Sequence, residues 1–448
     1  MNPFECKSRF AFGVVVAILS LLVLSVSGRA ANVQVVCPGG GPPGVYSSVS
    51  AALSALDPHG PNTITVSGTC VENIFIFQFE RLSIQSAPGQ SAVISAADPS
   101  AIVLQTFQST GILLSGLVFQ GGSTGVLLNQ GSNVTMVNCT MQQNSAEGLH
   151  MQMASTLVME NSTIQDNGDN GMFVGGGSSA HMATIPNQRI RVLRNGGDGI
   201  DIEGSYFQVN FGTLDVENNA GAAIFQTGGR LVIFDGGVSG GNLFQGNGEG
   251  IDIFNAGSAQ FFGRNVVRNN GDVGLQVLGS SVSFNGGGTL PDGTVRASVF
   301  EGHATLGVNI VRMGEVTFNG PHTISNNGNL TADPTLRGGI RVNRGSLTLS
   351  RGVQVSSNVG PGIRAEQNSG FFSIGDAMIV NNTEAGMLVT LQSEAAFAVT
   401  PVISGNGVAS ISCDTTSLIS GQLAGIANID CSRIARAMGP PRPGKIRP

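Results

Sequence analysis

The stretches Gly199-Ile200-Asp201-Ile202 and Gly250-Ile251-Asp252-Ile253 contain the phrase that decides the fold of this chain. The phrase is a turn of small or polar residues, a small residue, a branched apolar residue, a variable residue and a second apolar residue. Most neighbouring copies are 23 or 24 positions apart, which is the mark of a solenoid. The other copies begin at Gly125, Gly148, Gly171, Ala223, Gly274, Gly307, Gly339, Gly362 and Gly386.

One period contains three short strand signals, at residues 251–254, 259–262 and 265–267, with turn-forming residues between them. Strands this short cannot bury a face alone. Stacked at ~4.8 Å per coil, they form parallel sheets around a shared apolar core. The pattern predicts an all-β fold, a single right-handed parallel β-helix of about 11–13 coils with three short strands per coil. A leucine-rich solenoid would show Leu-rich phrases, which this chain does not have. A propeller repeats at ~40 or more residues, which the period of 23 or 24 excludes.

Asparagines recur near one turn of the period. An Asn at the same corner of successive coils can adopt the left-handed conformation, and its amide can bond the coils above and below. An internal asparagine ladder is therefore expected, and this role is favoured over glycosylation at the sequons of Asn133 and Asn161. The expected members are Asn144, Asn167, Asn195, Asn218, Asn247, Asn269 or Asn270, Asn326 or Asn327, Asn358, Asn381 and Asn406.

The ends of the chain differ from the repeat. Lys7 and Arg9 precede an apolar run at 10–26, and small residues follow, so residues 1–31 are predicted to be a signal peptide. The alternative is a membrane anchor, but the run is shorter than the ~18–20 apolar residues of a spanning helix. We expect a secreted protein, extracellular or periplasmic, without stable membrane insertion after signal cleavage. The remaining divisions are an N-terminal cap at 32–70, the β-helix at 71–431 and a flexible, basic, Pro-rich tail at 432–448.

The open start of a solenoid needs a cap, and residues 47–56 are expected to form a cap helix. An exported chain can form disulfides. Cys37 and Cys70 flank this helix, and Cys413 and Cys431 flank the last coil, so we expect these two pairs to be bonded. Cys139 is expected to be a buried free thiol. The apolar stripe of the helix is Val49, Ala52, Leu53 and Leu56.

The charge pattern argues against one class of partner. The net charge is -6, 11% of the residues are charged, and lysine occurs only at Lys7 and Lys445. Nucleic-acid binding requires a basic surface that neutralises phosphates. No nucleic acid is expected as a partner.

The start of the expected mature chain resembles a known family. The segments are Val-Val-Cys at 35–37, Ser-Val-Ser-Ala-Ala-Leu at 48–53 and Ile-Thr-Val-Ser-Gly-Thr-Cys-Val-Glu-Asn-Ile at 64–74. They resemble bacterial secreted right-handed parallel β-helix repeat proteins of the pectate-lyase-like superfamily, over residues 33–431. The resemblance implies the fold and an extracellular setting. It does not imply one reaction, because the superfamily contains polysaccharide lyases, glycoside hydrolases, epimerases, adhesins and tailspikes.

The variable residue of the phrase is expected to form an outward column along one face. Asp201 and Asp252 stand two coils apart, so ~10 Å separates their backbones, and flexible side chains bring an inverting glycosidase pair within reach. Asp198 and Glu249, at the preceding turns, repeat this relation. These four carboxylates are the candidate catalytic residues. The expected column is Leu127, His150, Phe173, Asp201, Phe225, Asp252, Gln276, Asn309, Arg341, Arg364 and Leu388.

Other column residues are candidates for substrate binding. Phe173 and Phe225 alternate with the acids, as rings that stack on sugars would. The candidates are completed by His150, Gln276 and Arg341. A plain alternative is that the column is polar because it faces solvent. Calcium between the carboxylates is also consistent with the pattern, although the sequence does not identify a metal or any certain cofactor.

No complete catalytic motif is present. Polygalacturonases share an Asn-Thr-Asp segment, an Asp pair, a His-Gly and an Arg-Ile-Lys. Gly302-His303-Ala304 and Arg189-Ile190-Arg191 are partial matches in the wrong order. We assign no catalytic role from them.

Four coils are lengthened, at 175–188, 235–242, 285–298 and 328–337. The second and third insertions follow the same strand two coils apart, so they should crowd one corner. One interpretation is that they wall a groove beside the acid column, and the other is tolerated variation in surface loops.

These observations predict a secreted protein that binds an extracellular polysaccharide along its side. Processing by a polysaccharide lyase or glycoside hydrolase mechanism is one version of this hypothesis. The alternative is a non-catalytic structural, adhesion or protein-interaction module of the cell surface. Oligomeric state is left open.

Overall fold

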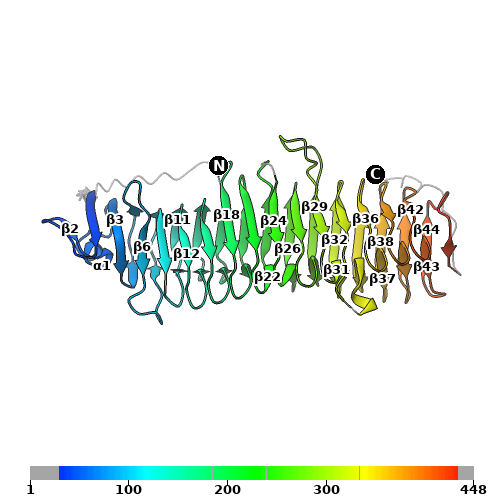
Figure 1. Cartoon of the computed structure of the whole chain (residues 1–448), viewed down its shortest axis with the longest axis horizontal. Helices are drawn as coiled ribbons and strands as arrows, with labels where there is room; N and C mark the ends of the chain where they lie inside the picture. Colours follow the sequence, from blue (N-terminus) through cyan, green and yellow to red (C-terminus); the bar gives the residue numbers. More distant parts are fainter. Residues whose placement is uncertain (1–29, 183–184, 238–239, 332, 432–448) are drawn as a thin grey trace, which may run out of the picture.

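The computed structural model describes residues 30–182, 185–237, 240–331 and 333–431, and these form one elongated solenoid (Figure 1). Each coil contributes three strands in the order predicted from the repeat. In one coil they are β25 (Glu249–Phe254), β26 (Ser258–Phe262) and β27 (Asn265–Arg268). Each pairs in parallel with its counterparts one coil earlier and one coil later. The all-β parallel β-helix is confirmed. The predicted signal peptide, apart from its last two residues, and the predicted tail lie outside the described residues.

The strands that carry the phrase form one 15-stranded sheet, here called the phrase sheet. Its strands are β4 (Ile74–Phe77), β7 (Leu104–Phe107), β10 (Val126–Asn129), β13 (Leu149–Met151), β16 (Met172–Val174), β19 (Ile200–Glu203), β22 (Ala222–Thr227), β25, β28 (Leu275–Leu278), β31 (Leu306–Val311), β34 (Gly338–Asn343), β37 (Ile363–Glu366), β40 (Met387–Val389), β43 (Ile411–Cys413) and β45 (Ile429–Asp430).

The second strand of each coil belongs to a sheet here called the middle ladder. Its strands are β1 (Ala31–Cys37), β2 (Val45–Tyr46), β3 (Asn62–Val71), β5 (Leu82–Ser86), β8 (Ile112–Ser115), β11 (Asn133–Val137), β14 (Thr156–Glu160), β17 (Ser179–Met182), β20 (Tyr206–Val209), β23 (Arg230–Phe234), β26, β29 (Ser281–Asn285), β32 (Glu315–Asn319), β35 (Ser346–Leu349), β38 (Gly370–Ser373), β41 (Glu394–Phe397) and β44 (Leu418–Gly421).

The third strand of each coil belongs to the closing ladder. Strand β3 is long enough to pair with β5 in the middle ladder and with β6 in the closing ladder, so it joins the two. The other closing strands are β6 (Ala92–Ser95), β9 (Leu117–Gln120), β12 (Thr140–Gln142), β15 (Thr163–Gln165), β18 (Arg189–Leu193), β21 (Thr213–Glu217), β24 (Asn242–Gln245), β27, β30 (Val299–Glu301), β33 (Thr323–Ser325), β36 (Gln354–Ser356), β39 (Met378–Val380) and β42 (Val402–Ser404).

The solenoid is longer than the expected 11–13 coils. The phrase sheet has 15 strands because β4, β7, β43 and β45 belong to it without the glycine or alanine of the phrase. In β4 and β7 the residues still alternate between buried and more exposed positions, as in Ile74 to Phe77. The small residue therefore marks only the regular coils, and the strands at both ends of the sheet lack it.

The core is a continuous apolar column enclosed by the three ladders. Ile251 and Ile253 point inward from β25, so Asp252 between them points to the other face. Phe261, Phe284 and Phe318 stack in successive coils of the middle ladder, with centroids 4.7 and 5.1 Å apart. Like residues at like positions thus bury one another across coils, which makes each coil depend on its neighbours.

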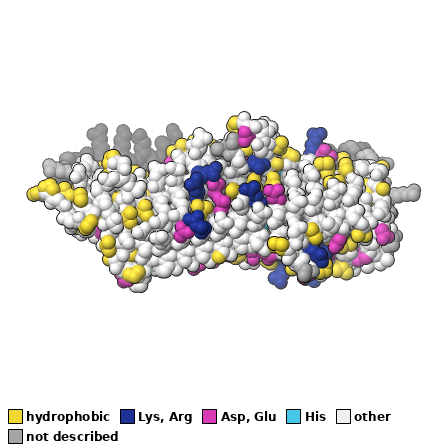
Figure 2. Space-filling view, viewed as in Figure 1, with side chains coloured by type: hydrophobic (Ala, Val, Ile, Leu, Met, Phe, Trp, Pro, Cys, Tyr) yellow, Lys and Arg dark blue, Asp and Glu magenta, His cyan; other side chains and the backbone are white. Residues whose placement is uncertain are grey.

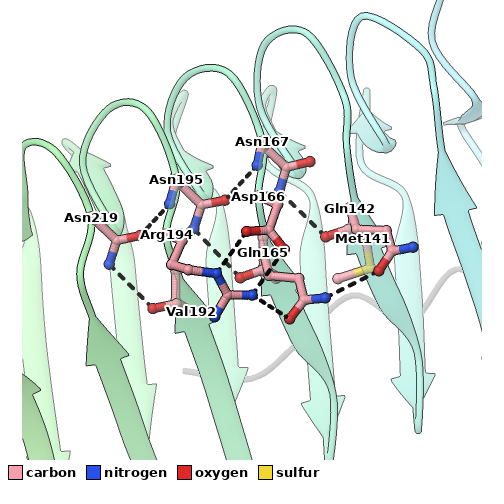
Figure 3. A network of polar contacts seen from close by, with 10 residues as sticks. Met141, Gln142, Gln165, Asp166, Asn167, Val192, Arg194, Asn195 and Asn219 are labelled. Carbon is pink, nitrogen blue, oxygen red and sulfur yellow. Dashed lines mark hydrogen bonds and ion pairs between the residues drawn. The ribbon is translucent and has the colours of Figure 1, made fainter.

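An asparagine ladder runs inside the corner between the closing ladder and the phrase sheet (Figure 3). In each step Oδ1 accepts from the backbone N–H and the Nδ2 of the preceding ladder residue. Asn167 donates from Nδ2 to Oδ1 of Asn195 at 2.9 Å, and Asn195 donates to Asn219 at 2.9 Å. The members are Asn144, Asn167, Asn195, Asn219, Asn247, Asn270, Asn327, Asn358, Asn382 and Asn406.

Two expected members, Asn218 and Asn381, are wrong by one position. In the structure, the left-handed turn and the hydrogen bonds between coils belong to two adjacent residues, whereas the sequence-based prediction assigned both to one asparagine. The residue before the ladder amide has a positive φ, as Asn218 (58°) and Asn381 (57°) show, while Asn219 and Asn382 bond the neighbouring coils. Asn269 and Asn326 likewise precede the true members.

His303 occupies one ladder position. Its Nδ1 accepts from the backbone N–H of Asn270, and its Nε2 lies 3.1 Å from the carbonyl oxygen of Val267. This is the donor and acceptor pattern of an Asn amide, and it requires the neutral ring with the proton on Nε2. Burial lowers the pKa of His303 to about 4, although the Val267 carbonyl opposes this shift. The partial Gly-His match in the sequence is therefore part of the ladder.

The start of the solenoid is covered by α1 (Val49–Ser54), shorter than the expected helix at 47–56. Ser48 accepts from the backbone N–H of Ala51, and Glu72 accepts from the N–H groups of Val49 and Ser50. These acceptors satisfy N–H groups that the first helical turn leaves free. Within the described residues, no helix has both the length and the apolar character needed to cross a membrane.

The cysteines are paired as the sequence suggested. Disulfides join Cys37 to Cys70 and Cys413 to Cys431. The first links β1 to β3 beneath α1, and the second links β43 to the last described residue. Cys139 is a buried free thiol, and burial raises its pKa to about 11.

The insertions lie at two different corners. The first, predicted at 175–188, includes β17 and ends where β18 begins. Those after β23 and β29 connect the middle to the closing ladder, whereas the one at 328–337 connects the closing ladder to the phrase sheet. In Figure 1 the loops after β23 and β29 rise from the edge opposite β22, β31 and β37. Arg296 bonds the buried Asp235 through Nε at 2.9 Å, so the second and third insertions do crowd one corner. The interpretation that they wall the acid column is wrong.

Candidate functional site

The outward column exists as a continuous row along the phrase sheet. Strand registers place Asp201 opposite Phe173 and Phe225, and Asp252 opposite Phe225 and Gln276. Every expected member takes its place in this order. The complete column is Phe75, Gln105, Leu127, His150, Phe173, Asp201, Phe225, Asp252, Gln276, Asn309, Arg341, Arg364, Leu388, Ser412 and Asp430.

The column is less exposed than an outward position suggests. Only 4% of Asp252 is accessible, and Asp201, Phe173 and Phe225 are half-buried. The plain alternative, that these acids are polar because they face solvent, does not hold for Asp252. A carboxyl group withdrawn from water carries a desolvation cost that an ordinary surface residue would not.

Asp201 has one partner and one free oxygen. Nδ2 of Asn170 donates to Oδ2 at 3.2 Å, while Oδ1 is buried without a hydrogen-bond partner. Burial, followed by the charges of Asp198 and Glu203, raises the pKa of Asp201 to about 7. The group can therefore exchange a proton near neutral pH.

Asp252 and Glu249 lie on the same strand and interact through their carboxyl groups. Burial, followed by a hydrogen bond with Glu249 and the charges of Glu249, Asp198 and Asp272, raises the pKa of Asp252 to about 9. Asp252 therefore carries a proton at neutral pH. Its Oδ1 is also buried without a hydrogen-bond partner.

Asp198 has a structural contact that the other acids lack. Its Oδ1 accepts from the backbone N–H of Ala222 at 2.6 Å, one coil further along. Burial raises its pKa, the Ala222 bond opposes this, and the charges of Glu249 and Asp169 add to the increase. The structure thus brings all four predicted carboxylates close enough to influence one another's pKa. Asp198 also bonds the backbone of the next coil at Ala222.

The aromatic candidates lie beside these acids. The rings of His150 and Phe173 have centroids 4.7 Å apart, and Phe225 meets Phe254 edge-on at 5.5 Å. Nδ1 of His150 lies 3.5 Å from Glu147, and this contact lowers the pKa of Glu147 to about 2. His150 is two coils from Asp201, with Phe173 between them.

The column changes character beyond Asp252. Gln276 accepts from Nδ2 of Asn309 at 3.2 Å, and Nε of Arg341 donates to Glu366 at 2.7 Å. Nη2 of Arg364 donates to the carbonyl oxygen of Pro334, in the insertion at 328–337 that contains η1 (Pro334–Leu336). This insertion is the one that flanks the column. Between His150 and Arg364 the column passes from aromatic rings through the two acids, with Phe225 between them, to amides and then guanidinium groups.

Several residues of this surface were missed from the sequence. Glu203 and Phe254 stand two positions after Asp201 and Asp252, and so point to the same face of a strand. Their alternation was a usable signal. Asn170, which bonds Asp201 from the preceding coil, had no such signal. At the start of the column, Phe75 and Phe77 are 54% and 46% exposed and stand near Phe107.

The described residues do not place a calcium site in the column. Among them, the one group of three or more His, Cys, Asp or Glu with ligand atoms within 4.8 Å of one another is Cys37, Cys70 and Glu72. The two sulfurs are bonded to each other. Asp201 and Asp252 are not in such a group.

Two hollows of the described surface are lined by residues outside the column. A groove of about 670 Å³ follows the ladder corner and includes Asn144, Ser145, Asp166, Gly168 and Arg194. A pocket of about 350 Å³ lies beneath the crowded insertions. Figure 2 shows basic and acidic side chains gathered midway along one face, on a surface that is mostly neither hydrophobic nor charged.

Comparison with known proteins identifies the repeat. Residues 67–239 match the family described as right handed beta helix region. No curated protein matches the chain. Strand pairing continues with the same order and direction from the matched segment through β44 and β45.

Three solved structures are similar. The A-module of the mannuronan C-5 epimerase AlgE4 from Azotobacter vinelandii is 13% identical, with 87% of this chain and 94% of that chain covered and a TM-score of 0.43. The alginate lyase from Paenibacillus sp. str. FPU-7 is 13% identical, with 91% and 98% covered and a TM-score of 0.30. Pectate lyase Pel9A is 11% identical, with 92% and 79% covered and a TM-score of 0.26. The family match and the chain's own parallel ladders, on which the assignment depends, make this a right-handed parallel β-helix protein.

Proposed function

We propose that this protein binds an extended carbohydrate polymer along the outward column of the phrase sheet. The observation that carries the proposal is the sequence of Asp201, Phe225 and Asp252 in consecutive coils. Acid and ring alternate at ~4.8 Å steps, so a polymer parallel to the axis meets hydrogen-bonding and stacking groups in turn. The predicted leader and the two disulfides support export to an extracellular or periplasmic site.

The same carboxyl groups support acid–base processing of the polymer. Asp252 holds its proton at neutral pH, as a general acid must, and Asp201 titrates near pH 7. Their backbones are two coils, or ~10 Å, apart. This arrangement suits hydrolysis or elimination in which one carboxyl donates a proton and the other accepts one.

The test is incubation of the purified protein with a panel of polysaccharides, with detection of binding and of reducing or unsaturated ends. Asp201→Asn and Asp252→Asn should each lower turnover about 100-fold or more, the usual effect of losing a general acid or base. Asp376→Asn is the matched control, because this exposed carboxyl lies away from the column. Equal turnover in all variants would remove the catalytic part, and no binding to any polymer would remove the whole proposal.

A non-catalytic surface module is the second candidate. It is favoured by the burial of Asp252, of which 4% is accessible, and by the exposed rings of Phe75 and Phe77, which offer a contact surface without acid groups. Binding to a glycan array without any product, unchanged in Asp252→Asn, would support this candidate over the enzyme.

A further inference from the structure

We infer that the acidic part of the column selects a polymer of amino sugars with protonated amino groups, and that it rejects polyuronates. This inference rests on the proposed carbohydrate binding and names the substrate class for that surface. It depends on three features of the described residues: an unpaired negative cluster, buried oxygens without donors, and an aromatic ring between them.

The cluster consists of carboxylates contributed by four of five successive coils, the coil of β22 contributing none. Within the described ranges, none of its members forms an ion pair with Arg or His, whereas Asp215, Asp235 and Glu366 elsewhere are each paired with an arginine. The ionised members repel one another without a counter-charge, and this repulsion helps to keep Asp201 and Asp252 protonated; a bound cation would relieve it. The members are Asp169, Asp198, Asp201, Glu203, Glu249, Asp252 and Asp272.

The second feature points to a ligand with several donors. Oδ1 of Asp201 and Oδ1 of Asp252 are both buried without a hydrogen-bond partner, and Asp252 as a whole is 4% accessible. Buried polar atoms in folded proteins are nearly always satisfied. An ammonium group supplies three donors and a positive charge, so it can satisfy carboxyl oxygens that the chain leaves unpaired.

The third feature favours a sugar over a simple ion. Phe225 stands between the two acids in register and is half-buried against Phe254. A ring in this position offers an apolar face to the C–H groups of a sugar, while the acids on either side receive its amino groups. A Phe ring offers no ligand atom to a metal ion. The carboxylates of the column do not converge as metal ligands within the described part of the chain.

The same geometry disfavours a polymer of uronic acids. Its carboxylates would be placed against a cluster of their own sign, and like charges at a close interface cost several kcal/mol. The nearest column arginine, Arg341, is three coils from Asp252 and is already paired with Glu366 at 2.6 Å. It therefore does not neutralise the acidic part.

The experiment is isothermal titration at pH 6 with three probes of equal length: glucosamine oligomers, the same oligomers N-acetylated, and galacturonic acid oligomers. Acetylation removes the charge and keeps the ring. We expect the glucosamine oligomers to bind about tenfold more tightly than the acetylated ones, with affinity falling as salt is added. We expect no binding of the uronic acid oligomers.

Two double variants each replace two carboxyl groups by amides. Asp201→Asn with Asp252→Asn should remove the preference for the glucosamine oligomers, whereas Asp376→Asn with Glu394→Gln, at exposed positions on other faces, should keep it within about twofold. Circular dichroism of each variant confirms folding.

The outcomes separate the two proposals. Equal affinity for acetylated and free oligomers, or a preference for uronic acids, overturns the amino-sugar inference and leaves carbohydrate binding intact. Binding of polylysine without binding of any sugar overturns both, since the surface would then recognise a basic peptide. No binding of any sugar by the wild-type protein overturns the proposed function itself.

Discussion

At the scale of single residues, the acids of the column are held at an energetic cost. Asp252 is withdrawn from water, interacts with Glu249 and has one oxygen without a partner. Such a residue lowers the stability of the fold and is retained where it serves a function. Stability and function should therefore respond to it in opposite directions.

Asp252→Asn should raise the stability of the protein at pH 7 by roughly 1–3 kcal/mol. The folded-state pKa of Asp252, about 9, is above the unfolded value of 3.8, so stability due to this group falls as the pH rises between these values. The gain should therefore disappear near pH 4. Urea denaturation at both pH values measures it. A variant that is less stable at pH 7 would show that the carboxyl contributes favourably.

His303 and His322 titrate in the opposite sense. Burial lowers the pKa of each to about 4, below the unfolded value of 6.5. The stability due to the neutral rings is present above pH 6.5 and is lost as the pH falls towards 4, by at most roughly 3 kcal/mol for each ring. His303→Asn, which keeps a ladder amide, should reduce that loss, while His59→Asn at an exposed site should not. Denaturation midpoints between pH 7 and pH 4 provide the check.

At the scale of elements, two adjacent residues have different roles at the corner that carries the asparagine ladder. One residue adopts the left-handed turn and the next bonds the coils on either side, as Asn218 and Asn219 do. The sequence period located the corner correctly. It did not separate the two residues, because both roles favour Asn and the chain often has two in a row.

Asn219→Ala should cost roughly 2–5 kcal/mol. The substitution removes the bonds to Val192 and Asn247 and leaves the N–H groups of Asn195 without their acceptor. Asn218→Gly is the adjacent control and should change stability little, because glycine accepts a φ of 58°. Urea midpoints compare the two. Equal effects would mean that the left-handed turn, and not the ladder, sets the stability of the corner.

At the scale of the whole molecule, the sequence predicted the solenoid and the order of the column because both follow from the period. It misplaced the long insertions. The insertions after β23 and β29 follow the second strand of a coil, and the corner after that strand is opposite the phrase sheet. The burial of Asp252 could not be predicted from the sequence either. It depends on how Glu249, Phe225 and Gln276 pack around Asp252 and not on spacing along the chain.

Each coil contacts mainly its neighbours, so local damage should stay local. Cys413→Ser with Cys431→Ser should increase amide hydrogen exchange in β43 and β45 and leave β22 and β25 unchanged. Exchange measured by mass spectrometry tests this, with Cys139→Ser as a control inside the solenoid. Faster exchange in every coil would mean that the rod unfolds as one cooperative unit.

The asparagine amides also give the rod an electrical direction. From Asn144 to Asn247, and again from Asn327 to Asn382, each Nδ2 donates to the Oδ1 of the next ladder residue towards the C-terminal end. Aligned dipoles add and polarise one another. At His303 the series is interrupted, because Nδ1 of the imidazole accepts from the backbone N–H of Asn270, while the Nδ2 of Asn270 keeps the bond to the carbonyl oxygen of Phe244 that the other ladder amides also make to the preceding coil. The molecule therefore contains two collinear dipoles of the same sense, separated by one imidazole.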